Sequence, residues 1–165
     1  MRHRLVALAA SLAACAAFGQ LSDPDWSEAD APPPPALRTD KLVPLAIPRS
    51  DLRFGIDPAS VSIGKDGIVR YVVVATSGSG VINAMYEGIQ CDKGEYRTYA
   101  RHTPGKGWTQ VNGDWHSVQD GAAARHALAM ARTGACMGST PNISPEQVIR
   151  DLSAGPEWRL RPEVR

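Results

Sequence analysis

The sequence has almost no net charge and a single long apolar run. Its 165 residues include 18 Lys and Arg against 17 Asp and Glu, which gives a net charge of +1. A chain so near neutrality offers no basic surface for nucleic acid or for an anionic membrane. After the first twenty residues, no apolar run approaches the roughly 20 residues that span a bilayer. We therefore expect no nucleic-acid partner, and no membrane contact except through a lipid.

Histidine and cysteine are also scarce, with four and three residues. None of His102, His116 and His126 lies three or four residues from another His or from a Cys, the spacing that metal-binding helices use. No C-x-x-C pair indicates a redox or zinc site. The loop at 77–80 matches neither a nucleophile elbow nor a dinucleotide-binding turn. The sequence thus predicts no metal, no cofactor and no complete catalytic set.

Residues 1–19 are typical of an export signal. Arg2 and Arg4 form a basic start, and residues 5–14 form an apolar segment too short to span a bilayer. Small residues follow it at once. Removal of this segment leaves 16 basic residues against 17 acidic ones, so the exported chain stays close to neutral.

Two cleavage sites compete at the end of this signal. Residues 12–15, Leu-Ala-Ala-Cys, resemble the lipobox of bacterial lipoproteins, in which Cys15 becomes the lipidated first residue. Residues 17–19 match the ordinary small-residue rule, which places the cut before Gln20 and removes Cys15. The first site is favoured because it also requires a Cys with a Leu three positions before it. If Cys15 is lipidated, Ala16 at the next position, rather than Asp, resembles the outer-membrane class of these lipoproteins. The chain is expected in the periplasm, with an outer-membrane anchor if Cys15 is lipidated.

Residues 20–47 are rich in proline and acidic side chains and have too few apolar residues for a core. We interpret them as a tether or extended arm, in which prolines 32–35 form a stiff polyproline II spacer. Trp26 is unusual in such a segment. A large indole normally packs on something, so we expect Trp26 to contact the folded domain rather than a partner.

The folded unit is predicted at 48–155, and its first half is rich in strand signals. Residues 61–63 and 68–76 are joined by a turn with glycine at its third position, which predicts a hairpin. Valines 72–74 run without polar alternation, which favours a central strand covered on both faces.

The second half combines two more strands with helices. Strands are expected at 81–90 and 95–102, and an Ala-rich helix at 122–132 that ends at Gly134. A short helix should begin near Ser144, and residues 156–165 read as a tail. These elements predict an α+β domain: one antiparallel sheet of about four to six strands, with one main and one short C-terminal helix packed on one face.

Cys91 and Cys136 remain after processing and form an even pair in an oxidising compartment. We expect them to form a disulfide. Cys91 follows a predicted strand and Cys136 follows the main helix, so the bond would join the helix to the sheet.

A long ordered set of polar, aromatic and Cys positions runs through the chain: the Asp66-Gly67 turn, Val69-Arg70-Tyr71, Asn83, Tyr86-Glu87-Gly88, Cys91, Tyr99-Ala100, Trp108 and Trp115. With this set the chain resembles the CNP1-like family, exported bacterial proteins named for a cryptic neisserial protein. The resemblance covers most of the mature chain. It implies a periplasmic or envelope domain and supplies no activity to carry over onto residues here.

Polar and aromatic residues on three adjacent predicted strands are the candidate binding site. Arg70, Glu87 and Arg97 could instead form a partly buried ion-pair network, which is the favoured interpretation. As a site, guanidinium groups beside aromatic rings would suit a carboxylate, a phosphate or a glycan. The candidates are Arg70, Asn83, Tyr86, Glu87, Arg97, Tyr99 and Arg101, with Trp108 and Trp115 as core residues or a binding platform.

Two functions follow from this pattern. The favoured one is a non-catalytic envelope protein that binds a partner protein or a cell-wall component. The alternative is a cell-wall hydrolase or transferase, with Glu87 as acid or base and Arg97 as an oxyanion partner. A second carboxylate or a His near Glu87 in an open cleft would favour the enzyme.

Overall fold

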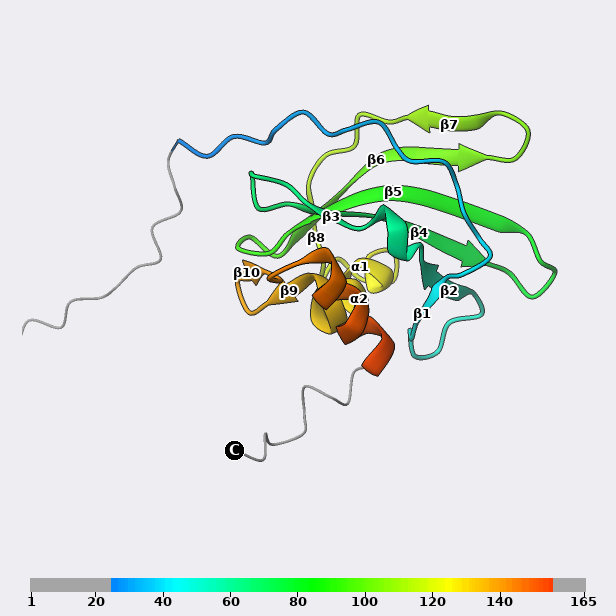
Figure 1. Cartoon of the computed structure of the whole chain (residues 1–165). Helices are drawn as coiled ribbons and strands as arrows, with labels where there is room; N and C mark the ends of the chain where they lie inside the picture. Colours follow the sequence, from blue (N-terminus) through cyan, green and yellow to red (C-terminus); the bar gives the residue numbers. More distant parts are fainter. Residues whose placement is uncertain (1–24, 156–165) are drawn as a thin grey trace, which may run out of the picture.

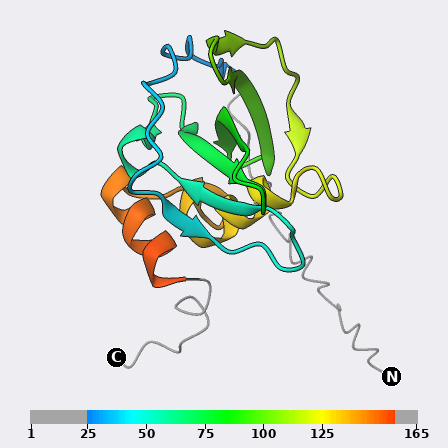
Figure 2. The ribbon, with the colours of Figure 1, turned by 90° about the vertical axis from the view of Figure 1, so that its right-hand side faces the viewer.

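The computed structural model describes residues 25–155. They form an antiparallel sheet with two helices on one face and the N-terminal arm, residues 25–42, on the other (Figure 2). The predicted export signal with Cys15, both predicted cleavage sites and the predicted tail at 156–165 lie outside the described residues.

Eight strands make up the main sheet. They are β1 (Val43–Leu45), β2 (Arg53–Ile56), β3 (Ser62–Ile63), β4 (Val69–Thr76), β5 (Ile82–Gln90), β6 (Glu95–Thr103), β7 (Gly107–Gln110) and β8 (His116–Ser117). Their order is β1-β2-β4-β5-β6-β7, with β3 beside β4 and β8 beside β6 (Figure 1). The α+β class is confirmed, but four to six strands was too few. Strands β1, β2, β7 and β8 have only two to four residues, too few to show a periodic pattern.

Strand β4 lies at the centre of this sheet, between β2 and β5. Every residue of β4 except Thr76 is buried, as the unbroken run of valines predicted. The predicted hairpin is also present, because β3 pairs with the start of β4 across a turn in which Gly67 has φ of 76°. The helices cover one face of β4, and the arm covers the other.

The helical layer consists of two short helices and a small hairpin. Helix α1 (Arg125–Met130) continues into a π-helical turn (Ala131–Ala135), and α2 is Pro145–Ala154. A 3-10 turn (Pro58–Ser60) precedes β3, and β9 (Cys136–Met137) pairs with β10 (Thr140–Pro141). Ser144 caps α2 by accepting a hydrogen bond from the amide of Gln147. The core between this layer and the sheet includes Tyr71, Val73, Met85, Ile89, Met130, Val148 and Leu152.

Gly134 does not end the main helix as predicted. The helix continues through it as the π-helical turn, and Gly134 lies buried against α2. A Cβ on Gly134 would lie 2.7 Å from Leu152 Cγ and 3.1 Å from the Val148 carbonyl oxygen. Glycine is therefore needed at this position for the close approach of two helical segments.

The predicted disulfide between Cys91 and Cys136 is present, with the two Cα atoms 5.6 Å apart. Cys91 directly follows β5, and Cys136 begins β9 directly after the π-helical turn. The bond therefore joins the helical layer covalently to the sheet, as expected.

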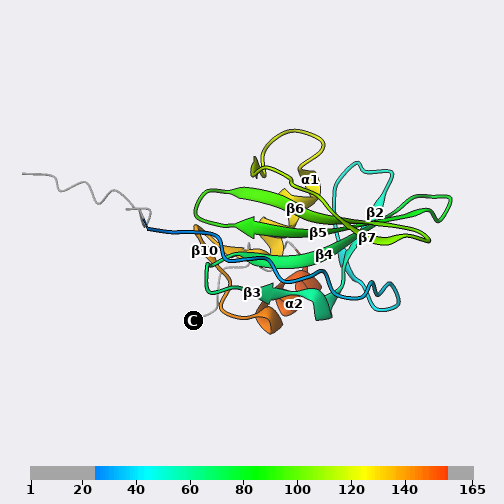
Figure 3. The same ribbon diagram turned by 90° about the horizontal axis from the view of Figure 1, so that it is seen from above.

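The arm runs along the open face of the sheet (Figure 3). Leu37 and Leu42 pack against a cluster of apolar residues on that face, which includes Val72, Val74 and Tyr86. The composition of residues 20–47 predicted a spacer, and the folded domain was expected to begin at residue 48. In the structure, Val43–Leu45 of that segment form β1, and Leu37 and Leu42 cover an apolar part of the sheet face that would otherwise be exposed.

Candidate functional site

The predicted binding residues are divided between the two faces of the sheet. Arg97 pairs opposite Gly88, one residue beyond Glu87, and successive residues of a strand point to opposite faces. Arg70 and Arg97 therefore lie under the arm, whereas Glu87 faces the helices. The predicted network of Arg70, Glu87 and Arg97 does not form. Arg70, Tyr86, Arg97, Tyr99, Trp108 and Trp115 contact the arm or its cavity, while Asn83, Glu87 and Arg101 line a cavity on the helical face.

A β-bulge decides which side chains of β6 face the arm. Tyr86 pairs with Ala100 and Glu87 pairs with Thr98, so Tyr99 is an extra residue in β6. Both Tyr99 and Ala100 join the apolar cluster beneath the arm. The bulge thereby places two consecutive residues on the same face and directs the Tyr99 ring toward the arm.

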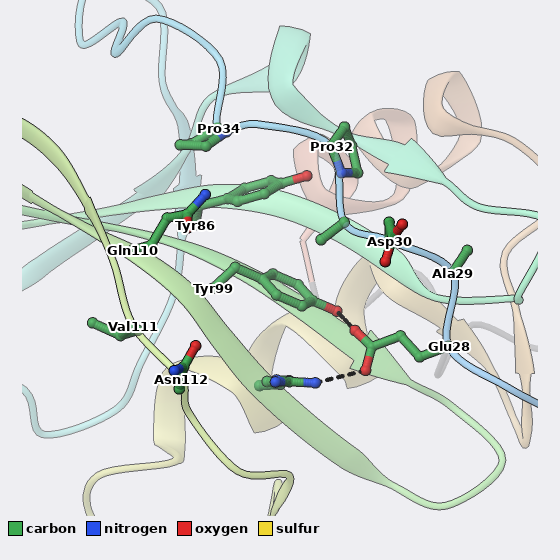
Figure 4. A pocket seen from close by; sticks show the side chains of 12 residues that line it. Glu28, Ala29, Asp30, Pro32, Pro34, Tyr86, Tyr99, Gln110, Val111 and Asn112 are labelled. Atoms are coloured by element: carbon green, nitrogen blue, oxygen red, sulfur yellow. Dashed lines mark hydrogen bonds and ion pairs between the residues drawn. The ribbon is translucent and has the colours of Figure 1, made fainter.

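Three donors on the sheet bind the carboxylate of Glu28, which comes from the arm. Arg97 Nη1 lies 2.7 Å from Oε2, Trp115 Nε1 lies 3.2 Å from the same oxygen, and the Tyr99 hydroxyl donates to Oε1 at 2.8 Å. Figure 4 shows Glu28 reaching from the arm to Tyr99. We call Arg97, Tyr99 and Trp115 the carboxylate clamp.

A buried ion pair lies beside the carboxylate clamp. Arg70 binds Asp66 through two hydrogen bonds, of 2.7 and 3.2 Å, and the two side chains are 3% and 2% exposed. Together they bind the backbone of Ala29: Arg70 Nη2 donates to its carbonyl, and its amide donates to Asp66 Oδ2. Burial alone would raise the pKa of Asp66, but hydrogen bonds from Arg70 and from backbone amides outweigh it, and the pKa is lowered.

Tyr99 lies directly over Gly88 on the neighbouring strand. A Cβ on Gly88 would be 2.7 Å from the Tyr99 hydroxyl oxygen and 2.8 Å from its Cε2 atom. Burial and then the hydrogen bond to Glu28 raise the pKa of Tyr99 far above its ordinary value, so its hydroxyl remains a donor. Glycine at 88 therefore leaves the space that this ring occupies over the neighbouring strand.

Two further indoles hold the arm. Trp26 Nε1 donates to the Asp66 carbonyl at 2.9 Å, and the Lys93 ammonium lies 4.7 Å from the centre of the Trp26 ring. Trp108 Nε1 donates to the Pro35 carbonyl at 2.8 Å. Trp26 packs on the domain as predicted. The arm is thus attached near both ends of the sheet face.

A cavity of about 440 Å³ remains between the arm and the sheet. Its sheet wall is formed by Tyr86, Arg97 and Tyr99, and residues 110–112 close one side. The arm forms the opposite wall, from Glu28 to Pro34 (Figure 4).

The other face contains a buried carboxylate, Glu87, which is fully buried. The hydroxyls of Tyr71 and Thr98 donate to it at 3.1 and 3.2 Å, and His126 Nε2 lies 3.0 Å from Oε2. His126 Nε2 also lies 3.1 Å from Oε1, so it faces both carboxylate oxygens. Burial, and then the facing Glu87 carboxylate, raise the pKa of Tyr71 well above its usual value, so the phenol remains a donor.

A cavity of about 350 Å³ opens beside the Glu87–His126 pair. The His126 ring is stacked on Phe54 at 5.8 Å and meets Tyr96 edge-on at 5.7 Å. Arg101 lies at the exposed side of this cavity, where its Nη1 contacts Met85 Sδ at 3.3 Å. The remaining lining includes Ile47, Leu52, Asn83 and Arg125. The cavity therefore combines apolar walls with cationic groups.

Four important residues were missed from the sequence. Glu28 was read as part of a solvated acidic tether, and Asp66 was read only as a turn residue. His126 was considered only as a metal ligand, and Tyr71 only as part of a strand. No local pattern identifies them, because their partners lie between 4 and 87 positions away in the chain.

Residues 25–155 contain neither a cluster of metal-binding side chains nor a membrane-spanning helix. Within that range, no three His, Cys, Asp or Glu side chains come close enough together to hold a metal ion. None of the helices in the same range is both long and apolar enough to cross a membrane.

Comparison with protein families gives one match, to the CNP1-like family, over residues 21–153. The match includes the arm, the whole sheet and most of α2. No curated protein and no solved structure matches the chain.

Proposed function

Since the chain belongs to the CNP1-like family of exported proteins, we propose that it works in the cell envelope as a non-catalytic domain that binds a small anionic ligand. The observation that carries the proposal is the cavity beside the Glu87–His126 pair. It is open, it is lined by three of the residues chosen from the sequence, and the arm does not fill it.

The lining indicates the chemistry of the ligand. Arg101 and Arg125 are exposed at this cavity, and guanidinium groups bind carboxylates and phosphates through paired hydrogen bonds. Phe54 and Tyr96 supply aromatic surface, on which a sugar ring or an aliphatic group can pack. A cell-wall fragment that carries both sugars and free carboxylates, such as a muropeptide, has this combination.

Arg101→Gln is expected to weaken muropeptide binding at least tenfold, because the variant loses a charge-assisted hydrogen bond worth about 1.5–3 kcal/mol. The melting temperature should stay unchanged, since the Arg101 side chain is exposed. Isothermal titration of purified muropeptides against the full chain measures the first effect, and thermal unfolding measures the second.

Arg53→Gln is the matched control, because Arg53 is an exposed arginine outside the cavity lining. It removes the same charge and should leave binding within twofold of the wild type. Equal losses of affinity in the two variants would show that only the net charge of the protein matters, and they would contradict a role for Arg101 in binding. Absence of any binding by the wild type would contradict the proposed ligand.

Catalysis is a second candidate, favoured by the 3.0 Å contact between Glu87 and His126 at the cavity wall. A carboxylate that fixes the orientation of an imidazole is a common arrangement for a general base. The expected partner of Glu87 was Arg97, which faces the other side of the sheet and binds Glu28. Mass spectrometry of the muropeptides after the titration distinguishes the two candidates, since a binding domain returns them unchanged.

Anchoring through Cys15 is also part of the proposal. The intact mass of the protein purified from its native envelope should show a chain that begins at a lipid-modified Cys15. It should also rise by two daltons on reduction of the Cys91–Cys136 bond. A mass beginning at Gln20 would instead mean a free periplasmic protein and would contradict the anchor.

A further inference from the structure

The arm contacts the sheet as a bound peptide would. None of residues 25–42 belongs to a strand, so the arm adds no hydrogen-bonded ladder to the sheet. The recorded hydrogen bonds between arm and sheet all use a side chain on at least one side, and they are concentrated at Trp26, Glu28, Ala29 and Pro35. A few anchored positions on an otherwise extended segment are typical of peptide recognition.

The first half of this face is specific for negative charge. Glu28 reaches the carboxylate clamp, and Arg70 Nη2 lies 3.9 Å from the same carboxylate. The arm also carries Asp25 and Asp30, and the sheet side adds Lys93. Arm and sheet are therefore complementary in charge along this half.

The second half is suited to proline. Pro32 and Pro34 line the same cavity as Tyr86 and Tyr99, and the Trp108 indole donates to the Pro35 carbonyl. Aromatic grooves in which an indole or phenol binds the exposed carbonyls of a polyproline II helix are a recurrent way to recognise proline-rich peptides. Such a helix is already rigid, so binding it costs little conformational entropy.

The arm leaves part of this site unused. Among residues 25–155, the Nε atoms of Arg70 and Arg97 are buried and have no hydrogen-bond partner. Arg97 also lines the cavity of about 440 Å³ between arm and sheet. A ligand that filled the cavity and met these donors would bind more tightly, residue for residue, than the arm does.

From these observations we infer that the sheet face under the arm is a peptide-binding site. Its ligand is an acidic, proline-rich segment of a partner protein, and the chain's own arm occupies the site until that segment displaces it. This site lies on the face opposite the cavity proposed for the small anionic ligand, and it does not depend on that proposal.

A synthetic peptide with the sequence of residues 25–37 tests the inference in trans. It carries a fluorescent label and is titrated against full chains, with anisotropy as the readout. In the double variant Trp26→Ala, Glu28→Gln, the contacts that hold the arm on the sheet are weakened, so the labelled peptide should bind. In the wild type, the tethered arm competes at a local concentration in the millimolar range, so binding should be at least tenfold weaker.

Matched peptides test the chemistry of the site. The peptide with Glu28→Gln loses the carboxylate that the clamp binds and should bind at least tenfold more weakly. The peptide with Ser27→Ala changes an exposed arm residue outside the cavity lining and should stay within twofold. No binding of the unchanged peptide to a folded, arm-weakened chain would overturn the inference, as would equal losses from the two substitutions.

Hydrogen exchange of the wild type gives a second test that needs no variant. A displaceable arm must open while the sheet stays closed, so the amide of Ala29, which is bound to Asp66, should exchange faster than the amides of β4. Simultaneous exchange would show that the arm opens only on unfolding, against the inference. Concentration-dependent dimers that Glu28→Gln abolishes would mean that arms exchange between copies, and they would overturn the choice of a partner protein.

Discussion

Glu87→Ala is expected to lower the free energy of unfolding by about 3–5 kcal/mol, because it truncates a fully buried side chain and leaves buried donors without their acceptor. The change removes the acceptor of Tyr71, Thr98 and His126 at once, and Tyr71 and His126 are buried. It also leaves a cavity where a fully buried side chain had packed. Urea unfolding measures the loss. The slope of the unfolding free energy against urea concentration should be the same in the variant as in the wild type.

Glu87→Gln is the matched control for this prediction. The Gln side chain keeps the volume of Glu87 and one acceptor oxygen. This substitution should therefore lower the free energy of unfolding clearly less than Glu87→Ala, although the new NH2 group faces the hydroxyl donors of Tyr71 and Thr98. Glu87→Ala and His126→Ala should not be additive, because the two side chains are in contact. A loss of stability below about 1 kcal/mol for Glu87→Ala would contradict a structural role for the Glu87–His126 pair. It would indicate that the pair serves the function of the protein instead.

Asp66→Ala should have an effect of similar size, about 3–5 kcal/mol, because it removes the paired carboxylate of the buried Arg70 guanidinium and leaves it only the more distant Glu28 carboxylate, at 3.9 Å. It also removes the acceptor of the Ala29 amide and of the Ile68 amide in the turn before β4. We therefore expect the arm to loosen as well, which fluorescence of Trp26 would report. Lys65→Ala, at the exposed neighbouring position, should stay within about 0.5 kcal/mol of the wild type.

The same ion pair makes stability depend on acid. Folding lowers the pKa of Asp66, so as the pH falls the unfolded chain takes up a proton at this residue before the folded chain does. The contribution of Asp66 is thus complete above the unfolded pKa of about 3.9 and is lost as the pH falls toward the folded value. Between pH 5 and pH 3 the wild type should lose more stability than Asp66→Asn. Parallel losses would exclude Asp66 as the source.

The predictable parts of the fold are those that depend on residues close together in the sequence. The Asp66-Gly67 turn, the run of valines in β4 and the capping Ser144 each act through their own segment, and each was found as expected. The disulfide was predictable from cysteine count and compartment. Strands β1, β2, β7 and β8 depend on partners elsewhere in the sheet and leave no pattern of their own.

The candidate site was less predictable for a similar reason. The side chains of Arg70, Glu87 and Arg97 are attractive partners by charge. The register of β4, β5 and β6, however, places both arginines opposite Gly88, on the face that Glu87 does not share. The bulge at Tyr99 changes that register by one residue, and no residue type marks it. The composition of the arm suits a spacer, whereas Trp26 and Glu28 contact residues that lie 40 to 87 positions away in the chain.

The docked arm also sets how far the domain can travel from a membrane. In a chain anchored at Cys15, ten residues (16–25) separate the lipid from the docked Trp26, a maximum span of about 35 Å. With the arm released, 27 residues (16–42) separate the lipid from β1, and the span grows to about 90 Å. A partner that captured the sheet face would then extend the radius within which an anchored domain can search the periplasm.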